Sequence, residues 1–289
     1  MINYIQIENF KSLKRLSLPL QNLNLFFGMN GMGKSSVIQS LLLLRQSFWE
    51  NHKSNLDYLY TNGDLIRLGT GKDIWCQSAA GDKIRFYVQY DNKVKHDCSY
   101  IYDVYDSESD ELERVGKRAD EDYSSALFAE NFSYLGAEHL GPRKQYSVEN
   151  WKRNGVIKLG TAGEFVVPFL AMEGDRITVS DKMCHKLGKT NRLMDQVSAW
   201  MAEISPGIRL TAQLISLAAE NGCQIICESH SDHVINGVRV AAKQGVIGNE
   251  KIGITYFSKN GNQETKTDNI YVDRKGNLSD YRDNMQDFP

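Results

Sequence analysis

The feature that most constrains this chain is the run Gly-Met-Asn-Gly-Met-Gly-Lys-Ser at residues 28–35. It satisfies the phosphate-loop pattern G-x-x-x-x-G-K-S. The apolar residues 23–27 before it read as a buried strand, and residues 36–48 after it read as a helix. Strand, glycine-rich loop and helix in this order are the context in which the pattern forms a phosphate-binding site. The sequence therefore predicts an α/β fold built around a phosphate-binding loop.

The residue types of the loop suit a nucleoside triphosphate with its magnesium ion. Glycines allow the backbone to curl so that N–H groups point inward, and the helix N-terminus adds partial positive charge. Lys34 is expected to reach the β- and γ-phosphates, and the Ser35 hydroxyl to bind Mg²⁺. The expected ligands are ATP and Mg²⁺. The candidate nucleotide-binding residues of the loop are Gly28, Met29, Asn30, Gly31, Met32, Gly33, Lys34, Ser35 and Ser36.

Three segments carry a resemblance to a known family. The chain opens with I-x-I-x-N-F-K-S, its phosphate loop contains Asn30-Gly31, and residues 223–236 form an apolar strand ending Glu-Ser-His-Ser. Together these resemble the ABC-type ATPases of the OLD, SMC and RecF-like group, although Ser229 stands where that group usually has threonine. Residues 134–143 also resemble a stretch of small bacterial OLD-like ATPases. Many of those belong to anti-phage systems such as Septu, PARIS and some retrons.

The resemblance implies a P-loop ABC-type ATPase core with an antiparallel β-subdomain and a helical subdomain. We expect one ATPase domain in two halves: residues 1–145 with the phosphate loop and the β-subdomain, and residues 146–289 with the helices and the switch strand. A half-buried strand is predicted near residues 84–90 by its alternating pattern. Residues 107–125 are acidic and polar, which favours a solvated loop or a short surface helix. Further helices are expected at 163–172, 191–204, 211–220 and 231–243, and further strands at 2–27, 98–105, 223–228 and 251–273.

One part of the ATPase machinery is missing from the sequence. Hydrolysis needs an acidic pair at the end of a buried strand, and the family also has a signature loop that covers the partner's γ-phosphate. Residues 204–210 run straight into the helix that should follow these motifs, so we expect that a segment is missing near Leu210. The alternative is that Glu228 is the catalytic acid. We favour the switch-strand reading, because His230 and Ser231 follow Glu228 directly.

The resemblance assigns roles to a few residues outside the loop. His230 is expected to contact the γ-phosphate, so His230 and Lys34 are the catalytic candidates. Lys11 and Ser12 lie in a tight turn that approaches the nucleotide in the family. Arg143 could contact a phosphate or a partner's acid, and an ordinary loop arginine is the equal alternative. Ser35 is the metal-binding candidate.

Composition excludes several classes of protein. Hydrophobic residues make up 41% of the 289-residue chain, which is too many for a disordered protein. No apolar run approaches the length of a membrane span, and we expect no signal peptide before the first strand. The five cysteines have no metal-binding spacing and no even disulfide framework, so we expect reduced thiols and a cytoplasmic protein. The net charge of −2 neither supports nor excludes a nucleic-acid partner.

The sequence thus predicts an ATPase that dimerises around Mg-ATP, or forms a higher homo-oligomer, and switches an assembly acting on nucleic acid. The expected setting is phage defence or DNA repair, with an associated nuclease or toxin and no membrane. Two alternatives stay open. One is an OLD-type nuclease, although Asp268, Asp273, Asp280 and Asp283 form no strand-anchored acidic triad. The other is a non-hydrolysing scaffold that binds ATP and holds a partner.

Overall fold

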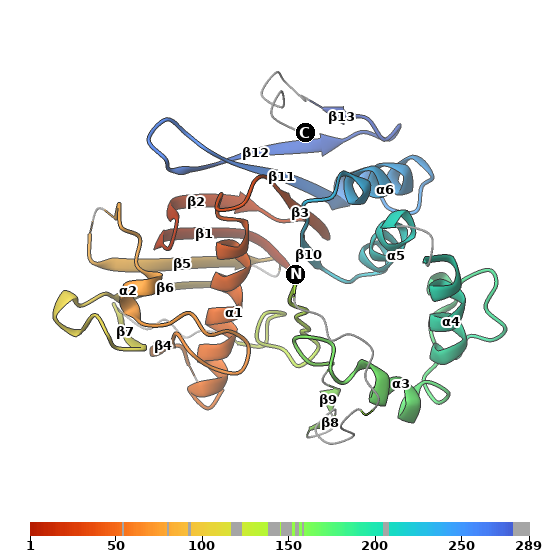
Figure 1. Cartoon of the computed structure of the whole chain (residues 1–289), viewed down its shortest axis with the longest axis horizontal. Helices are drawn as coiled ribbons and strands as arrows, with labels where there is room; N and C mark the ends of the chain where they lie inside the picture. Colours follow the sequence, from red (N-terminus) through yellow and green to blue (C-terminus); the bar gives the residue numbers. More distant parts are fainter. Residues whose placement is uncertain are drawn as a thin grey trace.

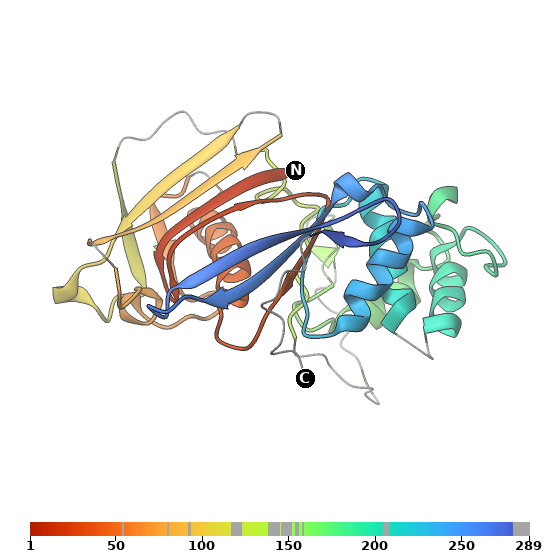
Figure 2. The same cartoon turned by 90° about the horizontal axis from the view of Figure 1, so that it is seen from above.

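The computed structural model describes residues 1–53, 55–79, 81–91, 94–116, 123–137, 145, 152–153, 156–157, 159–204 and 208–279. Two sheets dominate this part of the chain, and helices lie against both of them (Figures 1 and 2). None of the helices in these ranges is long and apolar enough to cross a membrane.

The larger sheet has six strands in the order β2-β1-β5-β6-β7-β4, and every neighbouring pair is antiparallel. Its strands are β1 (Ile2–Phe10), β2 (Leu13–Pro19), β4 (Tyr58–Tyr60), β5 (Lys83–Tyr90), β6 (Lys95–Ile101) and β7 (Glu111–Val115). The predicted alternation in β5 is observed, because Ile84, Phe86, Val88 and Tyr90 are all buried. This sheet is the predicted antiparallel β-subdomain.

The smaller sheet has five strands in the order β10-β3-β11-β12-β13. Its strands are β3 (Leu23–Phe27), β10 (Ile225–Glu228), β11 (Ile252–Lys259), β12 (Thr265–Val272) and β13 (Leu278–Ser279). β3 lies between β10 and β11 and runs parallel to both, while β11 and β12 form an antiparallel hairpin. β10 is an edge strand, paired only with β3 among the strands that the structure describes.

β3 joins two hydrophobic cores. Leu23, Leu25 and Phe27 pack with α5 (Ile208–Glu220) and α6 (Asp232–Lys243). Phe26 points to the other side and packs with the core of the six-stranded sheet. Burial on both faces explains why residues 23–27 form an unbroken, mostly apolar run. The first strand of the phosphate-loop motif is therefore one of the most constrained parts of the molecule.

The helix after the loop, α1 (Lys34–Glu50), packs onto the six-stranded sheet. It contributes five buried side chains to that core: Val37, Leu41, Leu43, Leu44 and Phe48. Burial of such side chains stabilises the fold by about 1.5–3 kcal/mol each. The helix is thus anchored along its length, and its N-terminus is held at a fixed position beside β3.

The remaining elements are short or lie at the far end of the molecule. α3 (Val166–Glu173) and α4 (Leu193–Ile204) lie farthest from the six-stranded sheet (Figures 1 and 2). The short elements are α2 (Gly71–Ile74), β8 (Lys152–Arg153), β9 (Val156–Ile157) and the 3₁₀ turns Val104–Asp106, Asp181–Met183 and Asn249–Lys251.

The predicted α/β fold with an antiparallel β-subdomain is confirmed. One local prediction was wrong: residues 107–125, expected to be a loop or surface helix, contain β7, which pairs with β4 and β6. Because β3 pairs with two strands from the second half of the chain, both halves share one sheet. The division at residues 145 and 146 stays a prediction.

Candidate functional site

The phosphate loop connects the end of β3 to the start of α1 (Figure 1). Gly28 has φ +133°, and a Cβ there would lie 2.2 Å from the carbonyl oxygen of Phe257 on β11. Gly33 has φ +101° and caps α1, and a Cβ there would lie 2.8 Å from a Leu13 methyl group. Only glycine fits both positions, because other residues are strained at such φ angles and would collide with these neighbours. The neighbours on β11 and β2 therefore enforce the curled backbone that the motif predicts.

Lys34 is buried, and its ammonium group folds back across the loop. Nζ donates hydrogen bonds to the carbonyl oxygens of Gly28 and Met29, each at 2.7 Å. Burial lowers the pKa of Lys34, and the nearby carboxylate of Glu228 partly opposes this shift. A buried ammonium satisfied by two loop carbonyls is a cation held ready at the predicted phosphate position.

Glu228 is the main addition that the structure makes to the site. Ser35 Oγ donates to its carboxylate, at 2.8 Å from Oε2 and 2.9 Å from Oε1. Lys34 Nζ lies 3.9 Å from Glu228 Oε1. Glu228 is the last residue of β10 and stands opposite Phe26 of β3, so the parallel register places it beside the loop. From the sequence, Glu228 was only the alternative candidate for the catalytic acid.

His230 lies two residues beyond the end of β10, on the exposed turn that leads into α6. The amide of Ser229 donates to the carbonyl of Phe26 at 3.1 Å, so the pairing with β3 continues to the residue before His230. Because β10 and β3 are parallel, this turn and the phosphate loop both follow the C-terminal ends of neighbouring strands. The role of His230 as a γ-phosphate sensor stays a prediction.

Lys11 and Ser12 form the turn between β1 and β2, as expected, and this turn lies against the loop. Lys11 has φ +52°, and its Nζ donates to Oε1 of Gln39 on α1 at 3.0 Å. Burial lowers the pKa of Lys11, with Asp73 opposing the shift. Ser12 Oγ lies 3.1 Å from the position that a Cβ on Gly33 would take.

Thr265, at the start of β12, is a residue that the sequence analysis missed. Its hydroxyl donates to the carbonyls of Met32 at 3.1 Å and Ser12 at 3.3 Å, so it ties the loop to the β1–β2 turn. An isolated threonine in a strand gave no signal for this role.

The outer part of the loop is open to solvent. Met29, Asn30, Gly31 and Ser35 are exposed, Met32 is half-buried and Ser36 is buried. Tyr134 is half-buried, and burial, followed by the negative charge of Glu228, raises its pKa. Arg143 lies outside the described residues.

The donor set fits a magnesium ion. Mg²⁺ prefers oxygen ligands and is usually held by one or two carboxylates, phosphate oxygens and waters. The Ser35 hydroxyl and the Glu228 carboxylate are already in contact, so both can face one ion beside a phosphate. The N-terminus of α1, with its partial positive charge, suits the phosphate itself.

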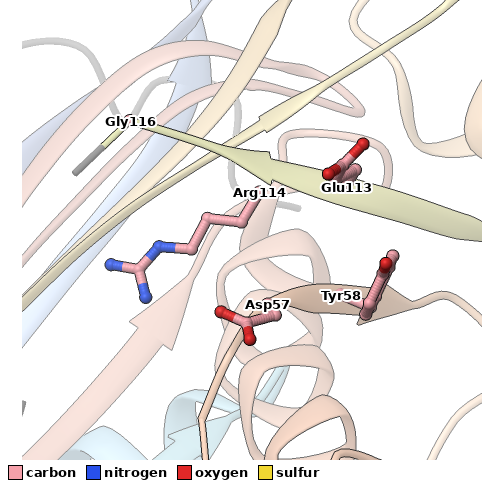
Figure 3. Close-up of a pocket in the computed structure, with 5 residues that line it drawn as sticks. All are labelled: Asp57, Tyr58, Glu113, Arg114 and Gly116. Carbon is pink, nitrogen blue, oxygen red and sulfur yellow. The ribbon is translucent and has the colours of Figure 1, made fainter. Parts of the chain in front are cut away.

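A separate small cavity of about 50 Å³ lies elsewhere, between β4 and β7 (Figure 3). It is lined by Asp57, Tyr58, Glu113, Arg114 and Gly116. No residue of the phosphate loop borders it, and its wall consists mainly of polar side chains on two short strands. We therefore place the candidate site at the loop.

Fold and loop together define an α/β protein built around a phosphate-loop motif. Residues 1–139 match the family model described as an AAA ATPase domain. This part of the chain contains the phosphate loop and the six-stranded sheet. No curated protein sequence is significantly similar to the chain.

Solved structures of similar shape include heads of SMC proteins and a recombination mediator. The SMC head domain from Thermotoga maritima aligns at 10% identity and a TM-score of 0.43, covering 94% of this chain and 99% of the other. The SmcHead bound to the C-winged helix domain of ScpA aligns at 13% and 0.42, covering 94% and 98%. The recombination mediator protein RecF aligns at 16% and 0.25, over 39% of this chain and only 26% of RecF.

Proposed function

We propose that this chain binds Mg-ATP at residues 28–35 and hydrolyses it as an ABC-type ATPase. The observation that carries the proposal is the contact between loop and switch strand. Ser35 and Lys34, the two residues the motif assigns to metal and phosphate, both face Glu228 at the end of β10. A glycine-rich turn with a purely structural role would not need a buried lysine next to a carboxylate.

Binding would rearrange two contacts. Lys34 would exchange the carbonyls of Gly28 and Met29 for phosphate oxygens, which are stronger acceptors because they are charged. The Ser35 hydroxyl would turn from Glu228 toward the metal, leaving the carboxylate free to hold a metal-bound water. When bound, Mg²⁺ neutralises charge on the β- and γ-phosphate oxygens.

The open outer side of the loop supports dimerisation as part of this function. Met29 is 61% exposed, and Asn30, Gly31 and Ser35 are exposed beside it. Rapid phosphoryl transfer needs positioned charge around the γ-phosphate. We therefore propose that a second subunit, in a homodimer or a higher homo-oligomer, closes over the loop.

The wider role is an assembly that acts on nucleic acid, in phage defence or DNA repair, with an associated nuclease or toxin. The resemblance of residues 134–143 to anti-phage ATPases supports this role. Within that segment, the structure describes residues 134–137, and the charge of Glu228 contributes, after burial, to raising the pKa of Tyr134.

One observation favours a second candidate, a scaffold that binds ATP without hydrolysing it. Among the described residues, Glu228 is the one carboxylate in contact with Ser35 or Lys34, whereas hydrolysis normally uses an acidic pair. The nuclease alternative has less support. Asp268 pairs with Lys266 and Asp273 caps a turn at Lys275, while Asp280 and Asp283 lie outside the described residues.

The deciding experiment measures ATP binding and phosphate release for the wild type and for Lys34→Ala. We expect the variant to bind Mg-ATP at least tenfold more weakly, because a hydrogen bond to a charged group contributes about 1.5–3 kcal/mol. Lys72→Ala, an exposed lysine on α2, is the matched control and should bind like the wild type. Equal affinities for the Lys34 variant and the wild type would contradict the assignment. Binding without phosphate release by the wild type would select the scaffold.

A further inference from the structure

The segment 176–192, between α3 and α4, concentrates positive charge. It contains five cationic side chains and one acidic side chain, Asp181. The cations are Arg176, Lys182, Lys186, Lys189 and Arg192. The segment therefore carries +4, and since the whole chain carries −2, the remainder carries −6. Positive charge is separated here from an otherwise acidic protein.

The segment is folded around one buried side chain, Gln196 of α4. Its Oε1 accepts from the amide of His185 at 2.6 Å, and its Nε2 donates to the carbonyl of Thr190 at 2.5 Å. A Cβ on Gly188 would come within 2.1 Å of Nε2, so the backbone passes too close for any other residue without rearrangement. Trp200 packs its ring against His185, with centroids 4.7 Å apart. These contacts give the backbone a defined shape.

The charges face outward from this folded backbone. All five cationic side chains are exposed. Arg176 makes a long ion pair of 3.8 Å with Glu173, and Lys182 lies near Glu220. In the part of the chain that the structure describes, Lys186, Lys189 and Arg192 have no ion pair. The segment projects at the end of the molecule farthest from the six-stranded sheet (Figures 1 and 2).

We propose that segment 176–192 is the surface that holds the phosphate backbone of nucleic acid. Several exposed cations on a backbone of fixed shape suit sequence-independent contacts with phosphates, whose affinity comes from counterion release. An acidic protein partner fits less well, because protein interfaces centre on buried apolar and aromatic side chains. Here the aromatic Trp200 is half-buried against the segment, and within residues 176–192 Leu187 is the single exposed apolar side chain. This inference deepens the proposed function. The binding surface is argued from its own charges, and only its role in the assembly rests on the proposed function.

The test measures binding of labelled duplex DNA, the matching single strand and duplex RNA by fluorescence anisotropy from about 50 to 200 mM salt. The test variant carries Lys186→Gln, Lys189→Gln and Arg192→Gln together. The control carries Lys72→Gln, Lys83→Gln and Lys95→Gln, which removes the same charge from exposed lysines beside the six-stranded sheet. Each lost phosphate contact lowers the salt slope for duplex DNA by about 0.9, so the test variant should lose about 2.7. Its affinity at about 0.1 M salt should fall at least tenfold.

The proposal is overturned if the wild type binds none of the three nucleic acids, or if test and control variants lose equal affinity. Binding of an acidic polypeptide without binding of nucleic acid would also overturn it. If the triple variant does not fold, Lys189→Gln alone should lower the slope by about 0.9. Lys34→Ala separates this inference from the ATPase proposal, because it should weaken ATP binding at least tenfold while nucleic-acid binding without nucleotide persists.

Discussion

Replacing Glu228 by glutamine separates charge from shape at the candidate site. Glutamine has nearly the same size, and its amide oxygen can still accept the hydrogen bond from Ser35 Oγ. Without Mg²⁺, the carboxylate repels the phosphates, so Glu228→Gln should bind ATP more tightly than the wild type. With Mg²⁺, the variant lacks a carboxylate that the metal prefers, so it should bind Mg-ATP more weakly. We therefore expect the substitution to raise the affinity for ATP without Mg²⁺ and to lower it with Mg²⁺, rather than to weaken binding in both conditions.

The size of the first effect follows from two distances. Glu228 Oε1 lies 3.9 Å from Lys34 Nζ. A phosphate oxygen bound to that ammonium would lie about 2.8 Å beyond it, so the carboxylate and the phosphate are at most about 6.7 Å apart. One charge pair at this distance contributes about 0.6 kcal/mol at the dielectric constant of water and about 2.5 kcal/mol at an effective value of about 20. Affinity without metal should therefore rise about 3- to 70-fold.

Isothermal titration with ATP, in EDTA and then with excess Mg²⁺, measures both effects. With the metal, we expect a loss of about 10- to 100-fold in the variant's affinity for Mg²⁺ in the ternary complex. Glu111→Gln, an exposed acid on β7, is the control and should change neither titration. A variant weaker than the wild type in EDTA would refute the electrostatic reasoning, since it would show that Glu228 supports the loop rather than repels the ligand.

The remaining predictions concern the rest of the machinery and the scaffold. Gly28→Ala should destabilise the fold by about 2–4 kcal/mol in chemical denaturation, because its Cβ meets the Phe257 carbonyl. Gly31→Ala, with open space around it, should destabilise the fold by only about 1–2 kcal/mol. Equal losses for the two variants would contradict the packing argument. His230→Ala should leave Mg-ATP affinity nearly unchanged and lower turnover by about tenfold or more, and a large loss of affinity would count against a transition-state role. The hydrogen bond from Lys251 lowers the pKa of Glu220, so the wild type should exceed Glu220→Gln in stability by about 0.2–1 kcal/mol at neutral pH. That advantage is present above the unfolded carboxyl's pKa of about 4.3 and should vanish as the pH falls through the lowered folded value, so a difference independent of pH would be the wrong result. Light scattering after size-exclusion chromatography should show a dimer with ATP, and a strict monomer that still hydrolyses ATP would rule out closure by a second subunit.

The sequence was a good guide wherever a local pattern decided the structure. The phosphate loop, the strands beside it and the helix that follows are set by neighbouring residues, and their bounds were close to those observed. β7 was missed because its alternation rests on one buried apolar residue, Leu112, among charged neighbours. A strand with so little apolar content is held by its partners in the sheet, and these come from distant parts of the chain.

The contact between Glu228 and Ser35 could not be predicted from the sequence either, because it too depends on pairing between distant strands. Whether the end of β10 reaches Ser35 depends on the parallel register of β10 with β3, two strands separated by most of the chain. The sequence indicated that an acid ended an apolar strand next to the loop strand, and only the structure gives the register that places this acid at Ser35. The contribution of Thr265 to the loop has the same origin, since it depends on how the β11–β12 hairpin folds back.

The edge position of β10 has a consequence for handling the protein. Parallel strands are normally covered on both sides, yet Ile225, Ile226 and Cys227 are only half-buried, and no described strand pairs with their outer edge. An exposed apolar edge strand without proline or lysine can pair with a strand of another molecule, and such pairing leads to aggregation. We therefore expect slow, concentration-dependent self-association that is insensitive to nucleotide. This insensitivity would distinguish it from assembly through the phosphate loop, and a lysine introduced at Ile226 should suppress it.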